Sequence, residues 1–214
     1  MNSNLFKQPH AFIDIETLGL TTDSPLLEVS VAVFDLKNEP NYAELVGEAI
    51  SFPFNVGEQF KTMRRVPDAS TLLWWMTDAS KARNEVMTRS LNCKEHNGTT
   101  LQSLASLLCG VEHIWCRGPH FDAALLESLA ADYDLRKMWD YWKIRDIRTL
   151  LFTLDKEDDA KKYKAEMEKS GEFVKHDSAH DVAIDAYLVA TYLREHFSRE
   201  YNDAAAQRKR VKAR

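Results

Sequence analysis

Two carboxylates lie inside a short segment that otherwise has the composition of a buried β-strand. The segment is AFIDIETLGL, residues 11–20, and its acidic residues are Asp14 and Glu16. Because side chains alternate between the two faces of a strand, both carboxylates share one face, about 6 to 7 Å apart. Unpaired charges beside a core cost several kcal/mol each, so a bound cation would explain the arrangement. Ligands that are all oxygen favour Mg²⁺ or Mn²⁺.

The Asp-x-Glu pattern is weak evidence when it stands alone. The 33 acidic residues among 214 predict about one such pattern by chance. A second copy, Asp155-Lys156-Glu157, lies in a run of alternating acids and bases, residues 155–172, that has no strand character. We interpret this run as a solvated helix with charged pairs one turn apart, and we discard the second copy.

The order of apolar segments predicts an α/β protein with a single domain. A chain of 214 residues is long enough for one well-buried core. Short runs rich in β-branched and aromatic residues alternate with stretches whose apolar residues recur at helical spacing. The first three strands form a meander, and the second half of the chain is mainly helical. Strands are expected at 10–16, 26–36, 45–54 and 112–116, and helices at 68–78, 99–109, 121–133, 145–154 and 178–204.

The composition excludes a disordered chain, and the charge argues at first against a nucleic-acid ligand. Hydrophobic residues make up 44% of the chain, with only seven Gly and six Pro. The formal net charge is −5, whereas phosphate-binding proteins usually carry a basic surface. Residues 208–214, RKRVKAR, form a basic tail, so the predicted domain, residues 1–207, is more acidic than the whole chain. The tail either attracts the substrate backbone or is a frayed, solubilising terminus.

The cysteines and the apolar runs favour a reducing compartment. Cys93, Cys109 and Cys116 are odd in number and include no C-x-x-C pair, which argues against a disulfide framework or a cysteine zinc site. No run approaches the roughly eighteen apolar residues of a membrane span, and the first residues lack a secretion signal. We expect a cytoplasmic protein without membrane association.

A third acid lies where the strand expected at 112–116 turns into a helix. Asp122 follows this turn in the string WCRGPHFDAALL. Functional sites of α/β proteins often open at such sheet edges. An Asp in the first turn of a helix is also an ordinary cap that complements the helix dipole, so both interpretations stay open.

A cluster of histidines and acids precedes the last predicted helix. It places His176 in a loop and Asp181 at the beginning of the helix, with Asp185 one turn later on the same face. Histidine has a near-neutral pKa, so a loop histidine can take a proton from water. The alternative is an ordinary helix start, capped by Asp177 or Ser178, with exposed histidines.

Taken together, these segments resemble the DEDDh branch of the DnaQ-like 3'-5' exonucleases. Shorter strings, among them DIETLG and YWKIRDIRTL, resemble the subgroup that contains the phage DexA exonuclease and the mycobacterial RNase AS. The resemblance covers about residues 11–195, and Arg117 departs from it, since that subgroup often has Asn before Gly-Pro. The three family motifs are matched by Asp14-x-Glu16-Thr17, by Phe121-Asp122, and by His176-x-Ser178-x-x-Asp181, with Ser178 in place of the usual Ala.

The resemblance implies an RNase H-like fold, with a central mixed sheet of five to six strands flanked by helices. It also implies that Asp14, Glu16 and Asp181 hold one Mg²⁺ ion, and that Asp14, with Asp122 through water, serves a second; Mn²⁺ can substitute. Two such ions lower the pKa of the attacking water and neutralise the leaving 3'-oxygen. His176 would take the proton from that water, and nucleoside 5'-monophosphates would leave from the 3' end.

The implied substrates are 3' ends of single-stranded DNA or RNA, with a slight preference for DNA. Thr17, Leu18 and Phe121 are the candidate substrate contacts, although a strand-end role suits Thr17 and Leu18 equally. Of the adjacent Trp74 and Trp75, at most one is expected to stack on a base, because neighbouring helical positions face about 100° apart.

Several alternatives stay open at this stage. They are an exoribonuclease of the same mechanism, a catalytically silent nucleic-acid-binding module, an RNase H-like endonuclease, and a homodimer whose interface completes the site. The negative charge no longer excludes nucleic acid, because two divalent ions would balance four clustered carboxylates. Binding should then be weak in chelator.

Overall fold

The computed structural model describes residues 5–77 and 81–212 and contains one five-stranded mixed sheet. The strand order is β3-β2-β1-β4-β5. β1 pairs with β2, and β2 with β3, in antiparallel fashion, whereas β4 and β5 run parallel to β1. The strands are β1 (His10–Thr17), β2 (Leu26–Phe34), β3 (Ile50–Pro53), β4 (His113–Cys116) and β5 (Ile144–Asp146). The predicted α/β class and the meander of the first three strands are confirmed.

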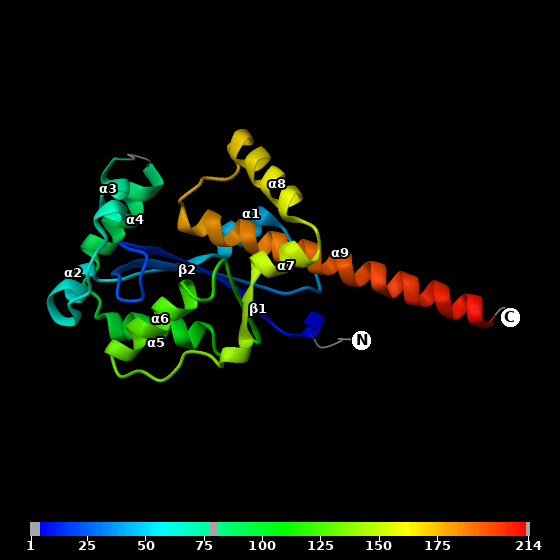
Figure 1. The fold of residues 1–214 in the computed structure, drawn as a ribbon, viewed down its shortest axis with the longest axis horizontal. Coiled ribbons are helices and arrows are strands. Elements are labelled where there is room, and N and C mark those ends of the chain that lie inside the picture. Colours follow the sequence, from blue (N-terminus) through cyan, green and yellow to red (C-terminus); the bar gives the residue numbers. More distant parts are fainter. Residues whose placement is uncertain (1–4, 78–80, 213–214) are drawn as a thin grey trace.

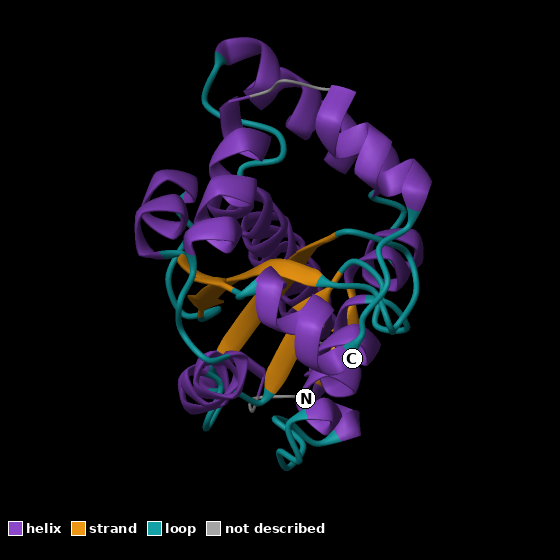
Figure 2. Cartoon of the chain, turned by 90° about the vertical axis from the view of Figure 1, so that its left-hand side faces the viewer, coloured by secondary structure: helices purple, strands orange, loops and turns teal. Residues whose placement is uncertain are grey.

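Helices cover both faces of the sheet (Figures 1 and 2). The α-helices are α1 (Tyr42–Glu48), α2 (Val56–Glu58), α3 (Ala69–Thr77), α4 (Lys81–Asn92), α5 (Asn97–Leu107), α6 (Asp122–Asp132), α7 (Ile147–Thr153), α8 (Glu157–Ser170) and α9 (Ser178–Lys212). Short 3-10 turns at Leu5–Lys7 and Tyr141–Lys143 and a π-helical turn at Gln59–Met63 complete the described elements.

The alternation of β1 divides the core into two layers. Ala11, Ile13 and Ile15 pack with α5 and α6 on one face. Phe12 packs on the other face, with buried residues of α1, α7 and α9. Since Asp14 and Glu16 have the same parity as Phe12, they point to the face that α9 covers. The strand pattern therefore directs both carboxylates toward the beginning of α9.

Two predicted elements were wrong in their local structure. The strand expected at 45–54 is split into α1 and β3, because Asn41 caps α1 by accepting a hydrogen bond from the Glu44 amide at 3.3 Å. The helix expected at 145–154 begins only at Ile147, because residues 144–146 pair with β4 as the edge strand β5. Helix α4 was not predicted at all.

The helix expected at 68–78 is α3, and its last position, Asp78, lies outside the described residues. Asp68 caps this helix, accepting a hydrogen bond from the Thr71 amide at 2.9 Å. The final helix is longer than expected. α9 continues without a break to Lys212, through the start of the basic tail, and extends away from the sheet (Figure 1). Residues 213–214 of the tail lie outside the described residues. Within the described part of the chain, none of the helices has the length and apolar character needed to cross a lipid bilayer.

Candidate active site

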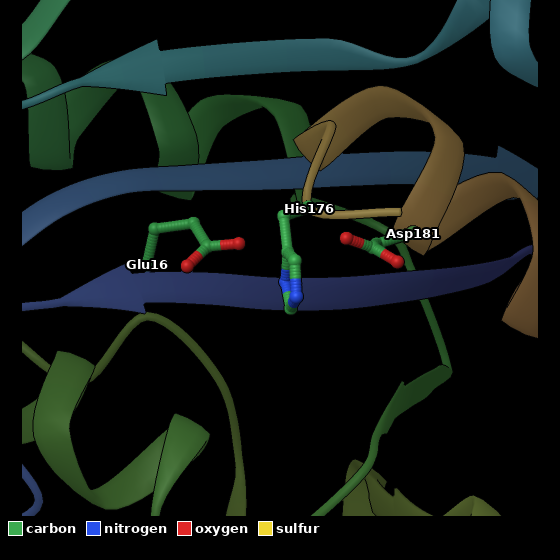
Figure 3. Close-up of side chains that lie close together, drawn as sticks. All are labelled: Glu16, His176 and Asp181. Atoms are coloured by element: carbon green, nitrogen blue, oxygen red, sulfur yellow. The ribbon is translucent and has the colours of Figure 1, made fainter. Parts of the chain in front are cut away.

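Three side chains from β1 and the beginning of α9 converge on one point. Potential ligand atoms of Glu16, His176 and Asp181 all lie within 4.8 Å of one another. Figure 3 shows His176 between the two carboxylates, with Glu16 on β1 and Asp181 on α9. The structure thus brings together the first and third predicted motifs, which are about 160 residues apart in the sequence.

The loop before α9 places His176 over the sheet. Its backbone has a φ of 64°, in the left-handed region that few side chains other than Asn, Asp and Gly adopt. Asp177 accepts hydrogen bonds from the amides of Ala179 and His180 at 3.1 and 3.3 Å, so it caps the helix, as the alternative interpretation of this segment expected. His180 is half-buried and bonded to the Tyr42 hydroxyl, which corrects the expectation that it would be exposed.

Asp122 opens α6 and is buried. Its carboxylate accepts a hydrogen bond at 3.0 Å from the Gly118 amide, in the turn between β4 and α6. The Asp122 carboxylate thus binds an amide of the turn before α6 and not an amide of the helix itself, so capping of α6 does not explain its position. Asp122 lies outside the tight Glu16, His176 and Asp181 group, but its charge acts on Asp14, Glu16 and Cys116.

Burial and like charges make the β1 carboxylates reluctant to ionise. Burial, followed by the charges of Glu16 and Asp181, raises the pKa of Asp14 well above its ordinary value. Burial and the charges of Asp181 and Glu28 raise the pKa of Glu16 to about 8. Burial also raises the pKa of Asp181 to about 7, against the opposing charge of Lys164. A cation bound among these carboxylates would favour their charged forms.

The donor set fits a divalent metal ion. Its members are carboxylate oxygens from two elements, joined by one imidazole, and hard oxygen donors suit Mg²⁺ or Mn²⁺. The converging ligand atoms belong to Glu16, His176 and Asp181, whereas Asp14 lies outside this group of three. Burial and the charges of Glu16 and Asp181 raise the pKa of Asp14, which couples it to the group, and a cation bound at this point would offset these effects.

Glu28 supports the site from β2 and was not found from the sequence. It is fully buried and pairs directly with Glu16 across the antiparallel strands. Arg89 of α4 binds its carboxylate through two hydrogen bonds of 2.6 and 2.7 Å. The Ser178 hydroxyl donates a further hydrogen bond to it. The Ser that replaces the usual Ala in the third motif therefore ties the beginning of α9 to the sheet.

A second ion-pair cluster lies beside the acids and was also missed. Asp185 is 4% exposed and accepts two hydrogen bonds from Arg117, at 3.0 and 2.6 Å. Lys164 of α8 lies 2.6 Å from the same carboxylate. The run 155–172, interpreted as a solvated helix, is mostly exposed, yet it supplies one cation to the site. Only the tertiary packing of α8 against α9 could reveal this contact.

A pocket of about 430 Å³ opens next to Glu16. Two of the predicted substrate contacts, Thr17 and Phe121, line it together with side chains of α3. Leu18 does not line it, since this side chain is 3% exposed and packs in a small core with Leu27 and Val56. Burial of this side chain argues against the expectation that Leu18 wedges against a nucleotide. Leu20, which is 73% exposed, lines the pocket instead.

The adjacent tryptophans have different environments, as predicted. Trp75 is buried, and its indole N–H donates a 2.8 Å hydrogen bond to the Thr17 carbonyl. Trp74 is 38% exposed, and its ring meets the His176 ring edge to face with centroids 5.1 Å apart. The guanidinium of Arg83 lies 3.4 Å from the Trp74 ring centroid. Trp74 is thus the more exposed member of the pair, with Arg83 over its ring.

Comparisons with known proteins agree with this geometry. A family model described as a 3'-5' exoribonuclease Rv2179c-like domain matches residues 9–195. A protein named exodeoxyribonuclease, from Enterobacteria phage T4, is 27% identical over 206 residues, which cover 85% of this chain and 88% of that protein.

Two solved structures share the fold. The zinc-bound E. coli ExoI–ssDNA complex superposes with a TM-score of 0.55 at 13% identity, covering 87% of this chain and 40% of the ExoI chain. The nuclease domain of 3'hExo, a DEDDh family member bound to rAMP, gives a TM-score of 0.54 at 10% identity, covering 92% of this chain and 94% of that domain. These similarities confirm the predicted RNase H-like fold.

Proposed function

Because the chain belongs to the 3'-5' exoribonuclease Rv2179c-like family, and is thus a DnaQ-like 3'-5' exonuclease, we propose that it shortens single-stranded nucleic acid from the 3' end with the help of divalent metal ions. The convergence of Glu16, His176 and Asp181 beside an apolar pocket carries the proposal. Nucleoside 5'-monophosphates are the products.

The pocket receives the terminal nucleotide. Its volume of about 430 Å³ falls within the range of small-molecule sites, roughly 300 to 1,000 Å³. Trp74 offers an aromatic face for the base, and Leu20 and Phe121 offer apolar contacts. Because Glu16 lines the same pocket, a nucleotide bound there presents its phosphodiester to the carboxylates.

Proton transfer is assigned to His176. Bound between Asp14, Glu16 and Asp181, and with Asp122 nearby, two Mg²⁺ ions would activate water and neutralise the leaving 3'-oxygen. The imidazole lies between the carboxylates of Glu16 and Asp181, and we assign to it the acceptance of a proton from the attacking water. The loop that carries His176 is anchored by Asp177 and Ser178.

DNA is the substrate we favour, since the phage relative is named an exodeoxyribonuclease and is aligned over most of both chains. The family description favours RNA instead. One experiment compares the two substrates: matched DNA and RNA oligonucleotides with a 5' label compete for the enzyme.

The experiment incubates these oligonucleotides with Mg²⁺ and resolves the products by length. We expect a ladder of single-nucleotide steps from the 3' end, lost in Asp14→Asn and in chelator. Asp155→Asn, in the discarded Asp-x-Glu copy, is the matched control and should retain full activity. Internal cuts would indicate an endonuclease, and binding without cleavage a silent module; either result would refute the proposal.

A further inference from the structure

The chain has an unusual cation at the edge of its acidic cluster. Arg117 follows β4 directly, at the position where the resembling subgroup often has Asn. β4 runs parallel to β1 with Phe12 opposite Trp115, so continuing this register by two residues sets Arg117 beside Asp14. Trp115 packs on the same face of the sheet as Phe12. By the alternation of strands, Arg117 and Asp14 also share that face.

Arg117 lies close enough to the acids for their charges to act on it. Burial lowers the pKa of Arg117, whereas the charges of Asp185, Asp14 and Asp181 raise it, and the net direction is upward. The side chain remains 36% exposed, so part of it is open to a ligand from solvent.

Asp185 holds the guanidinium in one orientation. Nε donates to one carboxylate oxygen at 3.0 Å and Nη2 to the other at 2.6 Å, in the bidentate geometry that orients a planar fork. In the part of the chain that the structure describes, both hydrogen bonds of the Arg117 side chain go to Asp185. Nη1 is left with its two N–H donors for a ligand.

The charge balance of the site favours an anionic ligand near the Arg117 guanidinium. Two divalent ions would supply four positive charges to the carboxylates, and Arg117 and Lys164 add two more. Counted with the acids alone, the ions leave a net negative charge, which Arg117 and Lys164 make positive; Arg83 and Arg148 add further positive charge beside Glu16 and Asp122. The acids counted are Asp14, Glu16, Asp122, Asp181 and Asp185.

We propose that Nη1 of Arg117 binds a non-bridging oxygen of the phosphodiester that is cleaved, while Asp185 and Lys164 hold the guanidinium in position. This inference rests on the proposed function and names a further residue of the same site. Preorganised donors aimed at developing negative charge are effective because they need no reorganisation during the reaction. A competing explanation is that Arg117 only neutralises Asp185.

A double substitution separates the two explanations. Arg117→Met removes the guanidinium but keeps much of the side-chain volume, and we expect kcat/KM to fall about 10- to 100-fold. Arg117→Met combined with Asp185→Asn removes both charges of the pair. If Arg117 contacts the phosphate, the double variant stays as slow as Arg117→Met. Recovery of activity in the double variant would overturn the inference in favour of charge balance.

Binding provides a readout that does not depend on turnover. Anisotropy is measured with Mg²⁺ at low salt, where phosphate contacts contribute most, on a labelled oligonucleotide whose 3'-terminal linkage resists cleavage but keeps both non-bridging oxygens. Arg117→Met and the double variant should both bind at least several-fold more weakly than the wild type. An unchanged affinity would overturn the inference. Lys161→Ala, on α8 but paired with Asp158, is the control and should bind normally.

Two further measurements keep the result interpretable. Circular dichroism melting shows whether Arg117→Met is folded; if it is not, Arg117→Lys retains the charge but lacks the planar fork, and it should lose most of the activity. Full activity of Arg117→Lys would overturn the bidentate arrangement. Failure of the wild type to produce a 3' ladder would refute the proposed function itself, whereas a ladder with recovery in the double variant refutes only the role of Arg117.

Discussion

Replacing Trp75 by Phe tests how α3 is attached to the catalytic strand. Trp75 is 6% exposed and packs against Leu18, Leu27 and Val86. Its indole N–H donates a 2.8 Å hydrogen bond to the carbonyl of Thr17, the last residue of β1. Phe retains an aromatic ring at this position but has no N–H, so the buried carbonyl loses its partner.

The magnitude follows from two contributions. A buried carbonyl left without its donor costs about 1 to 3 kcal/mol. The smaller Phe ring removes apolar contact from the core that Trp75 shares with Leu18, which adds about 1 kcal/mol. We therefore expect Trp75→Phe to lower the free energy of unfolding by about 2 to 4 kcal/mol.

Urea unfolding followed by far-UV circular dichroism measures this change. An unchanged m-value would show that wild type and variant expose the same surface on unfolding, so that the change in midpoint reports stability. Trp74→Phe is the matched control. Trp74 is 38% exposed and loses mainly part of a cation–π contact with Arg83, worth about 1 kcal/mol or less. Trp74→Ala should instead raise KM for an oligonucleotide. Equal destabilisation by the two Phe variants, or a loss below about 1 kcal/mol for Trp75→Phe, would refute the reasoning.

Three other outcomes follow from the structure. Gly19→Ala should destabilise the protein by about 1 to 3 kcal/mol, because a Cβ there would meet the Ser24 hydroxyl and lie 3.2 Å from a backbone nitrogen; an unchanged melting temperature would contradict this. Burial, followed by the charge of nearby His10, lowers the pKa of His113 to about 4, so the unfolded chain binds more protons between pH 4 and 6.5. Stability should therefore decrease by about 2 kcal/mol as the pH falls through this window, and His113→Gln should reduce the slope in urea titrations at pH 7 and 4.5. Removing divalent metal with chelator should weaken oligonucleotide binding in anisotropy titrations, and equal affinity with and without chelator would show that the metals do not offset the acidic cluster.

The sequence determined those features that depend on local periodicity. Alternation along 11–17 was enough to place Asp14 and Glu16 on one face, because the two-residue repeat of a strand holds in any sheet. The caps at Asp68 and Asp177 were predictable for the same reason, since a cap bonds to amides only two or three residues away. The order of the three motifs also identified the exonuclease family before the comparisons confirmed it.

Only the tertiary structure decided which distant residues support the acids. Arg117 and Lys164 reach Asp185 from separate elements, and Arg89 reaches Glu28 across 61 residues. No local pattern marks such partners, because their proximity results from how α4 and α9 pack on the sheet and how α8 contacts α9.

Long-range packing also explains why Leu20, and not the predicted Leu18, lines the pocket. Beyond the end of β1 the chain turns, with the Leu18 amide donating a hydrogen bond to the Pro25 carbonyl at 2.9 Å, and period-two alternation no longer applies. Which of two neighbouring leucines is buried then depends on the core that Trp75 and Val86 complete, and these residues come from helices far along the chain. Sequence periodicity thus located the acids, and long-range packing determined the charges and apolar surfaces around them.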